Sequence, residues 1–406
     1  MKGLWYSPTL RSMVVYGASG VGFSGANLIL ARVLPTEPYA LFTLVIALGN
    51  LGYSLAPAGL DGVVNRRHLD AGPSLLRLVL RTSTLAGVLF AIIGMVAYDM
   101  SWPLAVMLFA STVAGGAMMV AGARFQSEQR FGVSLALLQS PNIVLLVAAA
   151  VTAAAHLTGA WLPVLISTLG FVAAAIWGWV VLLRERPGKS PNPTTFLWGE
   201  ALSFAGLSAS GLLLIQLERL VIPHALPIAD LALYGVLGAI VGSLFRVLQM
   251  GVGFSLLPRL RAAGSVRERR RLVAREGQLV GAIVLGGSLL IWFVTPLVER
   301  WFLAGKYHLG ASLVAAAIVS GIGKIANAFT KAIAAALAEP RELSLVNACG
   351  WVSVAASVAG ALVGARWGLP GLIYGVAIGW FLRAVFAGVL MVRHLRLPSS
   401  VPVTAP

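Results

Sequence analysis

Charged residues are scarce in this chain, and acidic ones are the scarcest. Of its 406 residues only 11% are charged, with 14 Asp and Glu against 30 Lys and Arg. A soluble domain carries about a quarter charged residues, so this composition excludes a soluble fold. The one cysteine, Cys349, offers neither a disulfide framework nor a metal-ligand spacing. We therefore expect no disulfide, no metal site and no cofactor.

What the chain does have is apolar length. Hydrophobic residues make up 58% of it, and apolar runs of roughly 20 residues, enough to cross a hydrocarbon core of ~30 Å, recur along almost the whole sequence. We expect an all-α polytopic membrane protein of about twelve transmembrane helices. They are predicted at residues 12–34, 38–63, 79–98, 103–123, 131–155, 161–183, 197–222, 231–256, 278–298, 310–336, 343–365 and 370–392.

The gaps between these helices are too short for a soluble catalytic or nucleotide-binding domain. The five histidines are scattered along the chain and lie mostly near helix ends, so general base catalysis has no evident position. We expect no enzyme activity and assign no catalytic residue. The histidines are His68, His156, His224, His308 and His394.

The basic residues are distributed unequally between alternate loops. The two termini and the even-numbered loops hold 21 of the 30 Lys and Arg, whereas the odd-numbered loops hold five. Because cytoplasmic loops concentrate Lys and Arg, both termini are predicted to face the cytoplasm. The same bias accounts for the net charge of +16, so a nucleic-acid partner is not expected. The densest run, Arg267 to Arg275, is interpreted as a topology determinant.

An internal repeat divides the chain nearly in half. Tyr39 to Phe42 aligns with Tyr234 to Leu237 at a shift of 195 residues, and Arg77 to Arg81 aligns with Arg271 to Arg275 at 194. We predict two six-helix lobes, 1–190 and 191–406. Six is an even number, so both lobes begin in the cytoplasm and form the parallel repeat known among transporters, whose substrate sites lie between the lobes.

Four basic residues fall inside predicted helices. A charge at the bilayer centre costs ~2.5 to 3.5 kcal/mol on the insertion scale, so we expect these side chains to face a hydrated cavity. At 1.5 Å per residue, three of them lie ~20 Å below the outer edge and one lies almost two turns nearer the cytoplasm. The three are Arg246, Lys324 and Arg383, and the deeper one is Lys331.

Polar neighbours support a shared cavity face. Ser320, Lys324, Asn327 and Lys331 follow the spacing i, i+4, i+7 and i+11, which forms one stripe of a helix. Two helices of the first lobe offer similar stripes. In the predicted helix 12–34 the stripe is Tyr16, Gly20, Ser24 and Asn27. In the predicted helix 38–63 it is Asn50, Ser54, Pro57 and Asp61. Pro57 and Pro141 can kink their helices.

The acids within or beside the helices do not obviously neutralise the cations. Asp61 is close in sequence to Arg66, while Glu200 and Glu218 lie near opposite ends of one helix. A cation-rich cavity attracts an anion, and guanidinium suits phosphate through its fork of donors. A carrier of organic cations would instead need carboxylates and aromatic faces. The alternative is structural pairing or snorkelling to the interface, which applies most to Lys331 and to Arg32 at the outer end of helix 1.

Several motifs resemble one transporter family. Ala31 to Pro35, Tyr39 to Phe42 and Gly59 to Asp61 with Arg66 resemble the opening of polysaccharide-unit flippases of the Wzx type. These belong to the superfamily of multidrug, oligosaccharidyl-lipid and polysaccharide exporters, with the lipid II flippases and the MATE drug exporters. Gln216 to Ile222 resembles the second-lobe version, with Glu218 where Asp is usual. Ala26 replaces the basic residue of lipid II flippases, which disfavours a peptidoglycan-precursor role.

The resemblance implies a MATE-like fold and a flippase of the inner membrane. Its substrate would be an undecaprenyl-pyrophosphate-linked oligosaccharide for O-antigen, lipopolysaccharide or exopolysaccharide synthesis, and it implies partners among polysaccharide polymerase and assembly proteins. We assign the pyrophosphate to Arg246, Lys324, Arg383, Lys331 and Asn327, with Arg32 as a weaker candidate. Asp61 and Glu218 are candidates for H+ or Na+ coupling. The alternatives are a multidrug or metabolite antiporter of the same fold, or a membrane-embedded glycan polymerase or ligase.

Overall fold

A computed structural model describes residues 8–185, 198–242, 245, 260, 263, 265–338 and 340–396. The described residues are almost entirely helical and contain no strand, which confirms the expected fold class. The helices are α1 (Pro8–Val33), α2 (Thr36–Leu55), α3 (Leu60–Arg67), α4 (Pro73–Tyr98), α5 (Trp102–Ser127), α6 (Phe131–Ala154), α7 (Trp161–Glu185), α8 (Trp198–Ala225), α10 (Val266–Leu297), α11 (Ala311–Leu337), α12 (Pro340–Gly364) and α13 (Gly368–Arg396). A shorter apolar helix spans Ile228–Gly242.

Within the described ranges, nine helical stretches are long and apolar enough to cross a membrane, and the last of them, Ser344–Val392, covers most of α12 and of α13. The outward faces of these helices are apolar as well. Leu289, Phe293 and Leu297 of α10 are exposed at successive turns, and Leu85, Leu89 and Val96 are exposed on α4. Continuous apolar faces of this kind suit contact with lipid chains. The chain is a polytopic membrane protein.

The predicted helix 38–63 is interrupted, and this part of the prediction is wrong. α2 ends at Leu55 and α3 begins at Leu60. Pro57 lacks an N–H group, and Ala58 and Gly59 have φ of 51° and 83°, which no α-helix accommodates. A Cβ on Gly59 would lie 1.8 Å from the carbonyl oxygen of Ala201 in α8. The expected stripe from Asn50 to Asp61 is therefore broken by a turn.

Pro141, by contrast, remains inside α6. It cannot donate to the carbonyl of Leu137 one turn earlier. The hydroxyl of Ser140 donates to that carbonyl instead, at 2.8 Å. The backbone acceptor that proline frees is thus satisfied by its neighbour.

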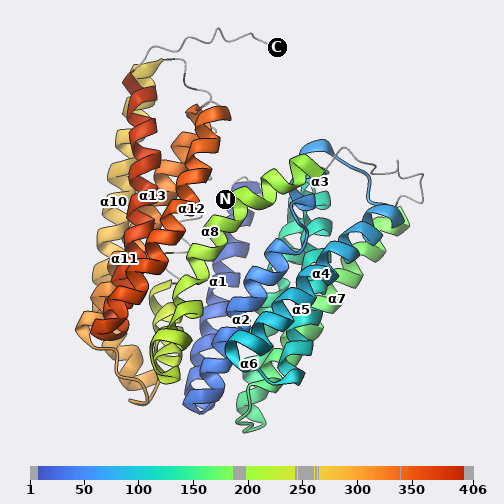
Figure 1. Ribbon diagram of the computed structural model, residues 1–406, viewed down its shortest axis with the longest axis vertical. Helices are drawn as coiled ribbons and strands as arrows, with labels where there is room; N and C mark the ends of the chain where they lie inside the picture. The colour runs from blue at the N-terminus through green and yellow to red at the C-terminus, as the bar shows by residue number, and fades with distance from the viewer. Residues whose placement is uncertain are drawn as a thin grey trace, which may run out of the picture. The chain divides into compact units, whose positions relative to one another are not determined.

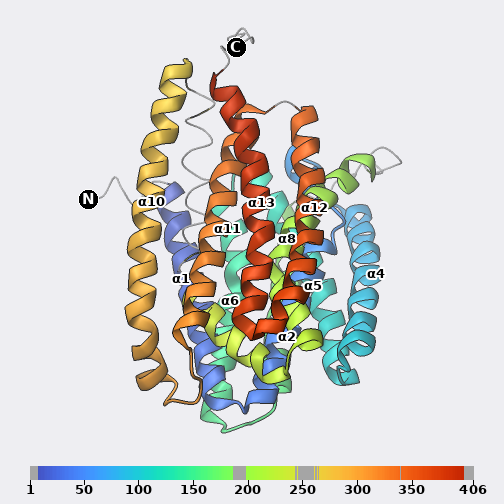
Figure 2. The ribbon, with the colours of Figure 1, turned by 60° about the vertical axis from the view of Figure 1, so that its left-hand side comes forward.

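α10 begins earlier than the predicted helix 278–298. The basic run Arg267 to Arg275 forms its first turns, and the hydroxyl of Ser265 accepts the N–H of Glu268 at 3.2 Å as an N-cap. Nε of Arg270 donates to the carbonyl of Leu395 near the end of α13, at 2.7 Å. α10 is visible along its full length in Figure 2.

The chain forms two compact units, Met1–Ala239 and Ile240–Pro406. In the first unit α5 packs against α2, α3, α4, α6 and α7, and α8 runs past α2 to α3 (Figure 1). The repeat in the sequence predicts a different boundary, at residue 190. That boundary would assign α8 to the second lobe, although α8 contacts α2 and α3 of the first unit. The lobe boundary at residue 190 stays a prediction.

In the second unit α13 lies between α11 and α12 (Figure 2). Glycines let α12 and α13 approach backbone to backbone. A Cβ on Gly364 would lie 2.1 Å from the carbonyl oxygen of Gly371, and one on Gly375 would lie equally close to that of Gly360. The α12–α13 hairpin is consequently a tightly packed support for the residues that α13 carries toward α11.

Candidate functional site

The predicted polar stripe lies on one continuous helix, α11. Ser320 and Asn327 are buried, Lys324 is half-buried and Lys331 is exposed. Among the residues that the structure describes, neither the Ser320 hydroxyl nor Oδ1 of Asn327 has a hydrogen-bond partner. Buried polar groups are nearly always partnered in proteins, and other described residues also have unpartnered buried atoms, among them the hydroxyls of Ser83 and Thr112.

α13 supplies the opposite side of this stripe. A Cβ on Gly323 would lie only 3.1 Å from Cβ of Trp380, so α11 and α13 approach closely there. Trp380 is fully buried, and Nζ of Lys324 lies 5.8 Å from its ring centroid. This is a cation–π distance. The indole therefore holds the ammonium group beside the α11–α13 seam.

Arg383 follows Trp380 by one turn of α13. Its side chain is only 2% exposed. Nε and Nη1 of this guanidinium have no hydrogen-bond partner within the described part of the chain. Neither α11 nor α13 contains an Asp or Glu. The fold thus buries a permanent charge on a seam whose two helices provide no acid to neutralise it.

Lys331 is electrostatically linked to Arg383. The depth count sets Lys331 apart from the other cations, yet the two charges lie near enough to repel each other. We define Lys324, Asn327, Lys331 and Arg383 as the basic cluster. Three of its four side chains are cationic, and an excess of positive charge attracts anions. Arg246, assigned to the same site from the sequence, lies outside the described residues.

The candidates of the first unit have more ordinary surroundings. Arg32 is exposed in the last turn of α1. Asp61 lies in the first turn of α3, where a carboxylate stabilises the free N–H groups of a helix N-terminus. Glu218 is completely buried in α8. Of the two acids proposed for coupling, Glu218 has the more unusual position.

Arg219, beside Glu218, is one of the five basic residues that the sequence assigned to the odd-numbered loops and the adjoining helix ends, and it is buried. Its side chain is 8% exposed, Nη1 donates to Oε1 of Gln216 at 2.9 Å, and the guanidinium lies 5.7 Å from the ring centroid of Tyr234. The spacing Gln216 to Arg219, i to i+3 on a helix, was the available signal. A second polar group missed by sequence joins Ser19 of α1 to Gln139 and Asn142 of α6.

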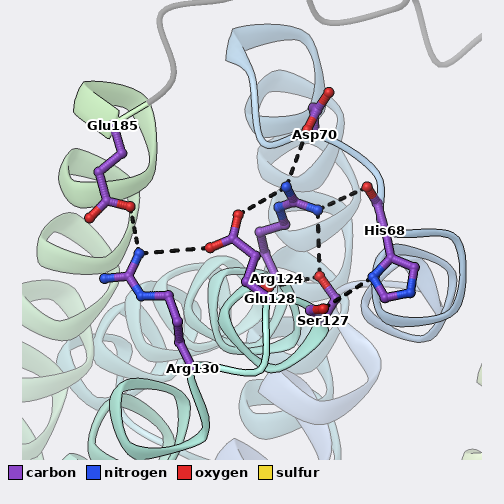
Figure 3. A network of polar contacts seen from close by, with 7 residues as sticks. All are labelled: His68, Asp70, Arg124, Ser127, Glu128, Arg130 and Glu185. Atoms are coloured by element: carbon purple, nitrogen blue, oxygen red, sulfur yellow. Dashed lines mark hydrogen bonds and ion pairs between the residues drawn. The ribbon is translucent and has the colours of Figure 1, made fainter.

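A third polar group lies where α3, α5, α6 and α7 end or begin (Figure 3). Its centre is Arg124, only 3% exposed. The guanidinium donates to the carbonyl of His68 at 2.8 Å and pairs with Asp70 at 3.2 Å and Glu128 at 2.9 Å. Arg130 extends the network by pairing with Glu185 at 2.5 Å. Every one of these contacts joins segments within the first unit.

Glu200 pairs with arginines near the same end of the first unit. Its carboxylate lies 3.3 Å from Arg66 and 2.6 Å from Arg67. These bonds tie α8 to α3. Glu200 thus pairs with the two arginines at the end of α3.

The turn between α10 and α11 carries a separate set of charges. Glu299 accepts the backbone N–H of Leu309 at 3.0 Å and contacts Nδ1 of His308 at 2.9 Å. Burial lowers the pKa of the Lys306 ammonium, since desolvation disfavours the charged form. These contacts shape the turn.

Across the described residues no group of three or more His, Cys, Asp and Glu side chains could hold a metal ion.

No protein-family model and no curated protein matches the chain by sequence. Its structure is similar to an inward-facing multidrug resistance MATE family transporter of the MOP superfamily, with a TM-score of 0.65 and 14% identity over 94% of each chain. It is similar to the MATE multidrug transporter DinF-BH, with a TM-score of 0.63 and 11% identity over 97% of this chain and 96% of that one.

The lipid II flippase MurJ, in an inward closed conformation, is also similar, with a TM-score of 0.62 and 10% identity over 93% of this chain and 86% of that one. At these identities the similarity establishes the fold. The chain has a MATE-like fold, as its sequence predicted. Because drug transporters and a lipid flippase share this fold, the substrate must be inferred from the site itself.

Proposed function

We propose that this protein is a flippase of the inner membrane that moves an undecaprenyl-pyrophosphate-linked oligosaccharide to the outer leaflet for surface polysaccharide synthesis. The observation that carries the proposal is Arg383, which is buried while two of its nitrogens lack a protein partner among the described residues. An uncompensated buried charge costs several kcal/mol. A ligand that accepts hydrogen bonds from the free guanidinium nitrogens would offset this cost.

The chemistry of the basic cluster selects among ligands. Arg383, Lys324 and Lys331 are all cationic, and Asn327 adds an amide oxygen and an amide NH2 group. A pyrophosphate spreads its negative charge over several oxygens and matches the guanidinium fork. A multidrug antiporter for organic cations, the first alternative, would meet repulsion here. A glycan polymerase or ligase could also hold pyrophosphate with arginine, but no histidine lies in the basic cluster to act as a general base.

Coupling to H+ or Na+ is proposed at Glu218 ahead of Asp61. Glu218 is fully buried in an apolar helix, where a proton or cation changes the electrostatic energy most. Asp61 lies in the first turn of α3, where a carboxylate stabilises the helix N-terminus without a bound ion. Partners among the polysaccharide polymerase and assembly proteins remain part of the proposal from family resemblance.

The proposal is tested by charge reversal in a strain that needs the gene for surface polysaccharide. Arg383→Glu should abolish polymer export, because it places a carboxylate against the pyrophosphate. Arg383→Met is the second variant, since it removes the charge with less risk to folding. The matched control is Arg366→Glu, a charge reversal at an exposed arginine next to α13.

Membrane levels of each variant are measured by immunoblot and surface polymer by gel electrophoresis. If Arg383→Glu is present at the normal level and exports polymer like the control, the basic cluster does not bind the substrate. If deleting the gene leaves the polymer unchanged and abolishes efflux of a lipophilic cationic dye, the antiporter alternative replaces the flippase.

A further inference from the structure

A neutral polar cluster joins α1 and α6 inside the first unit. The Ser19 hydroxyl donates to Oε1 of Gln139 at 2.6 Å and accepts from Nδ2 of Asn142 at 2.6 Å. Nδ2 of Asn142 also lies 3.3 Å from Oε1 of Gln139. Ser19 is buried and the two amides are half-buried. The three side chains thus hold one another in a single arrangement.

The backbone is adapted to this cluster on both helices. On α1, a Cβ at Gly22 would lie 3.3 Å from the carbonyl oxygen of Asn142, so glycine allows the helices to approach. On α6, Pro141 separates the two amides, and the Ser140 hydroxyl repairs the hydrogen bond that proline removes. The polar segment 139–142 is therefore a rigid, built part of the helix.

The cluster leaves two hydrogen-bonding groups unused. Among described residues, Nε2 of Gln139 and Oδ1 of Asn142 have no protein partner, and neither atom is fully buried. Nε2 offers two N–H donors, and Oδ1 offers two lone pairs as an acceptor. One donor group and one acceptor group thus remain available, both on side chains whose orientation Ser19 fixes.

The depth of the cluster makes this availability significant. Gln139 is the ninth residue of α6, so it lies ~12 Å along a helix that crosses a ~30 Å hydrocarbon core. An unsatisfied amide facing lipid at that depth costs several kcal/mol. The seam between α1 and α6 must therefore meet water or a polar ligand.

We propose that Gln139 and Asn142, oriented by Ser19, form a subsite for the hydroxyl groups of a sugar. This inference rests on the proposed function and adds to it the recognition of the glycan, as distinct from its pyrophosphate. Gln139, Asn142 and Ser19 are uncharged, α6 carries no charged residue and α1 carries no acid, so these two helices offer no carboxylate for a metal or an organic cation. Neighbouring sugar hydroxyls both donate and accept, which matches the free amide NH2 group of Gln139 and the free amide oxygen of Asn142.

The test compares two probes on purified protein in detergent. One is undecaprenyl pyrophosphate, and the other is undecaprenyl pyrophosphate carrying a single N-acetylglucosamine. The wild type should bind the sugar-bearing probe about tenfold more tightly, as two added hydrogen bonds predict. The double variant Gln139→Met with Asn142→Leu should lose this preference and bind bare undecaprenyl pyrophosphate as the wild type does.

Two controls separate the subsite from the rest of the protein. Thr152→Val alters a hydroxyl of α6 that bonds its own helix, to the carbonyl of Ala148 at 2.8 Å, so it should bind both probes normally. Arg383→Met should weaken both probes equally. If the double variant fails to fold, Gln139→Asn replaces it. This variant keeps the amide but shortens the side chain by one methylene group. It should reduce the preference for the sugar-bearing probe and leave the affinity for undecaprenyl pyrophosphate unchanged.

The outcomes distinguish the two proposals. If the wild type shows no preference for the sugar, or the double variant keeps the full preference, the subsite is wrong and the pyrophosphate site stands. If the wild type binds neither probe, the flippase proposal itself fails.

Discussion

Arg124 and Arg383 are buried to nearly the same degree, 3% and 2% exposed, yet their surroundings are opposite. Arg124 has a backbone carbonyl and two carboxylates around its guanidinium, as Figure 3 shows. Arg383 has two nitrogens without any such partner among the described residues. Burial alone therefore does not distinguish the two arginines. The partners around each guanidinium do.

The difference also separates two kinds of stability. Removing a partnered buried charge strands the acids that face it, whereas removing an unpartnered one relieves a cost that folding already bears. We expect Arg124 to contribute to folding and Arg383 to contribute to ligand binding.

The largest effect is expected for Arg124→Leu. Glu128 and Asp70 would lose their common partner, and the unfolding free energy should fall by about 3 kcal/mol. Unfolding of the purified protein in SDS-containing micelles measures this. Arg130→Leu, whose side chain is more exposed, is the matched control and should cost less. Equal stability of Arg124→Leu and the wild type would show that the network in Figure 3 is incidental.

An intermediate effect is expected for Arg383→Leu, and in a different quantity. The affinity for undecaprenyl pyrophosphate should fall by about 10- to 100-fold, since a hydrogen bond to a charged group contributes ~1.5 to 3 kcal/mol. The unfolding free energy should stay the same or rise. Binding to the purified protein and SDS unfolding are measured on one preparation. A loss of stability like that of Arg124→Leu would overturn the comparison.

The smallest effect is expected for Glu200→Gln. Its partner arginines are largely solvent-accessible, with side chains 69% and 38% exposed, so the loss should stay below ~1 kcal/mol. It should also shrink in 1 M salt, where the Debye length is about 3 Å. The Arg124 effect should persist in the same salt. If the loss of unfolding free energy in Glu200→Gln did not depend on salt, the ion pairs between α3 and α8 would be as well shielded from solvent as those of Arg124.

Most of the helices could be predicted from apolar runs, because each long apolar run must span the bilayer whatever its neighbours are. The stripe on α11 could also be predicted, since its spacing is a property of one helix. The break between α2 and α3 could not. Pro57 suggested a kink, but the full turn depends on Gly59 lying against the backbone of Ala201 in α8.

The same limit applies to the polar clusters. Ser19 and Asn142 are 123 residues apart, and nothing in either segment indicates the other. From the sequence, Arg124 and Arg130 were only counted among the basic residues of the even-numbered loops. Only the structure adds Asp70, Glu128 and Glu185 around them.

The amino-acid sequence by itself determined that this protein spans a membrane with long helices and that some of these helices contain basic residues. It could do so because hydrophobicity and helical spacing are local properties. The tertiary structure decided which of its buried charges have partners. An ion pair or hydrogen bond between two segments depends on the distance between them in the folded protein, and neither segment's sequence indicates it. The sequence placed Arg383 inside a helix and Arg124 at the end of one, but the partners around each guanidinium are visible only in the folded structure.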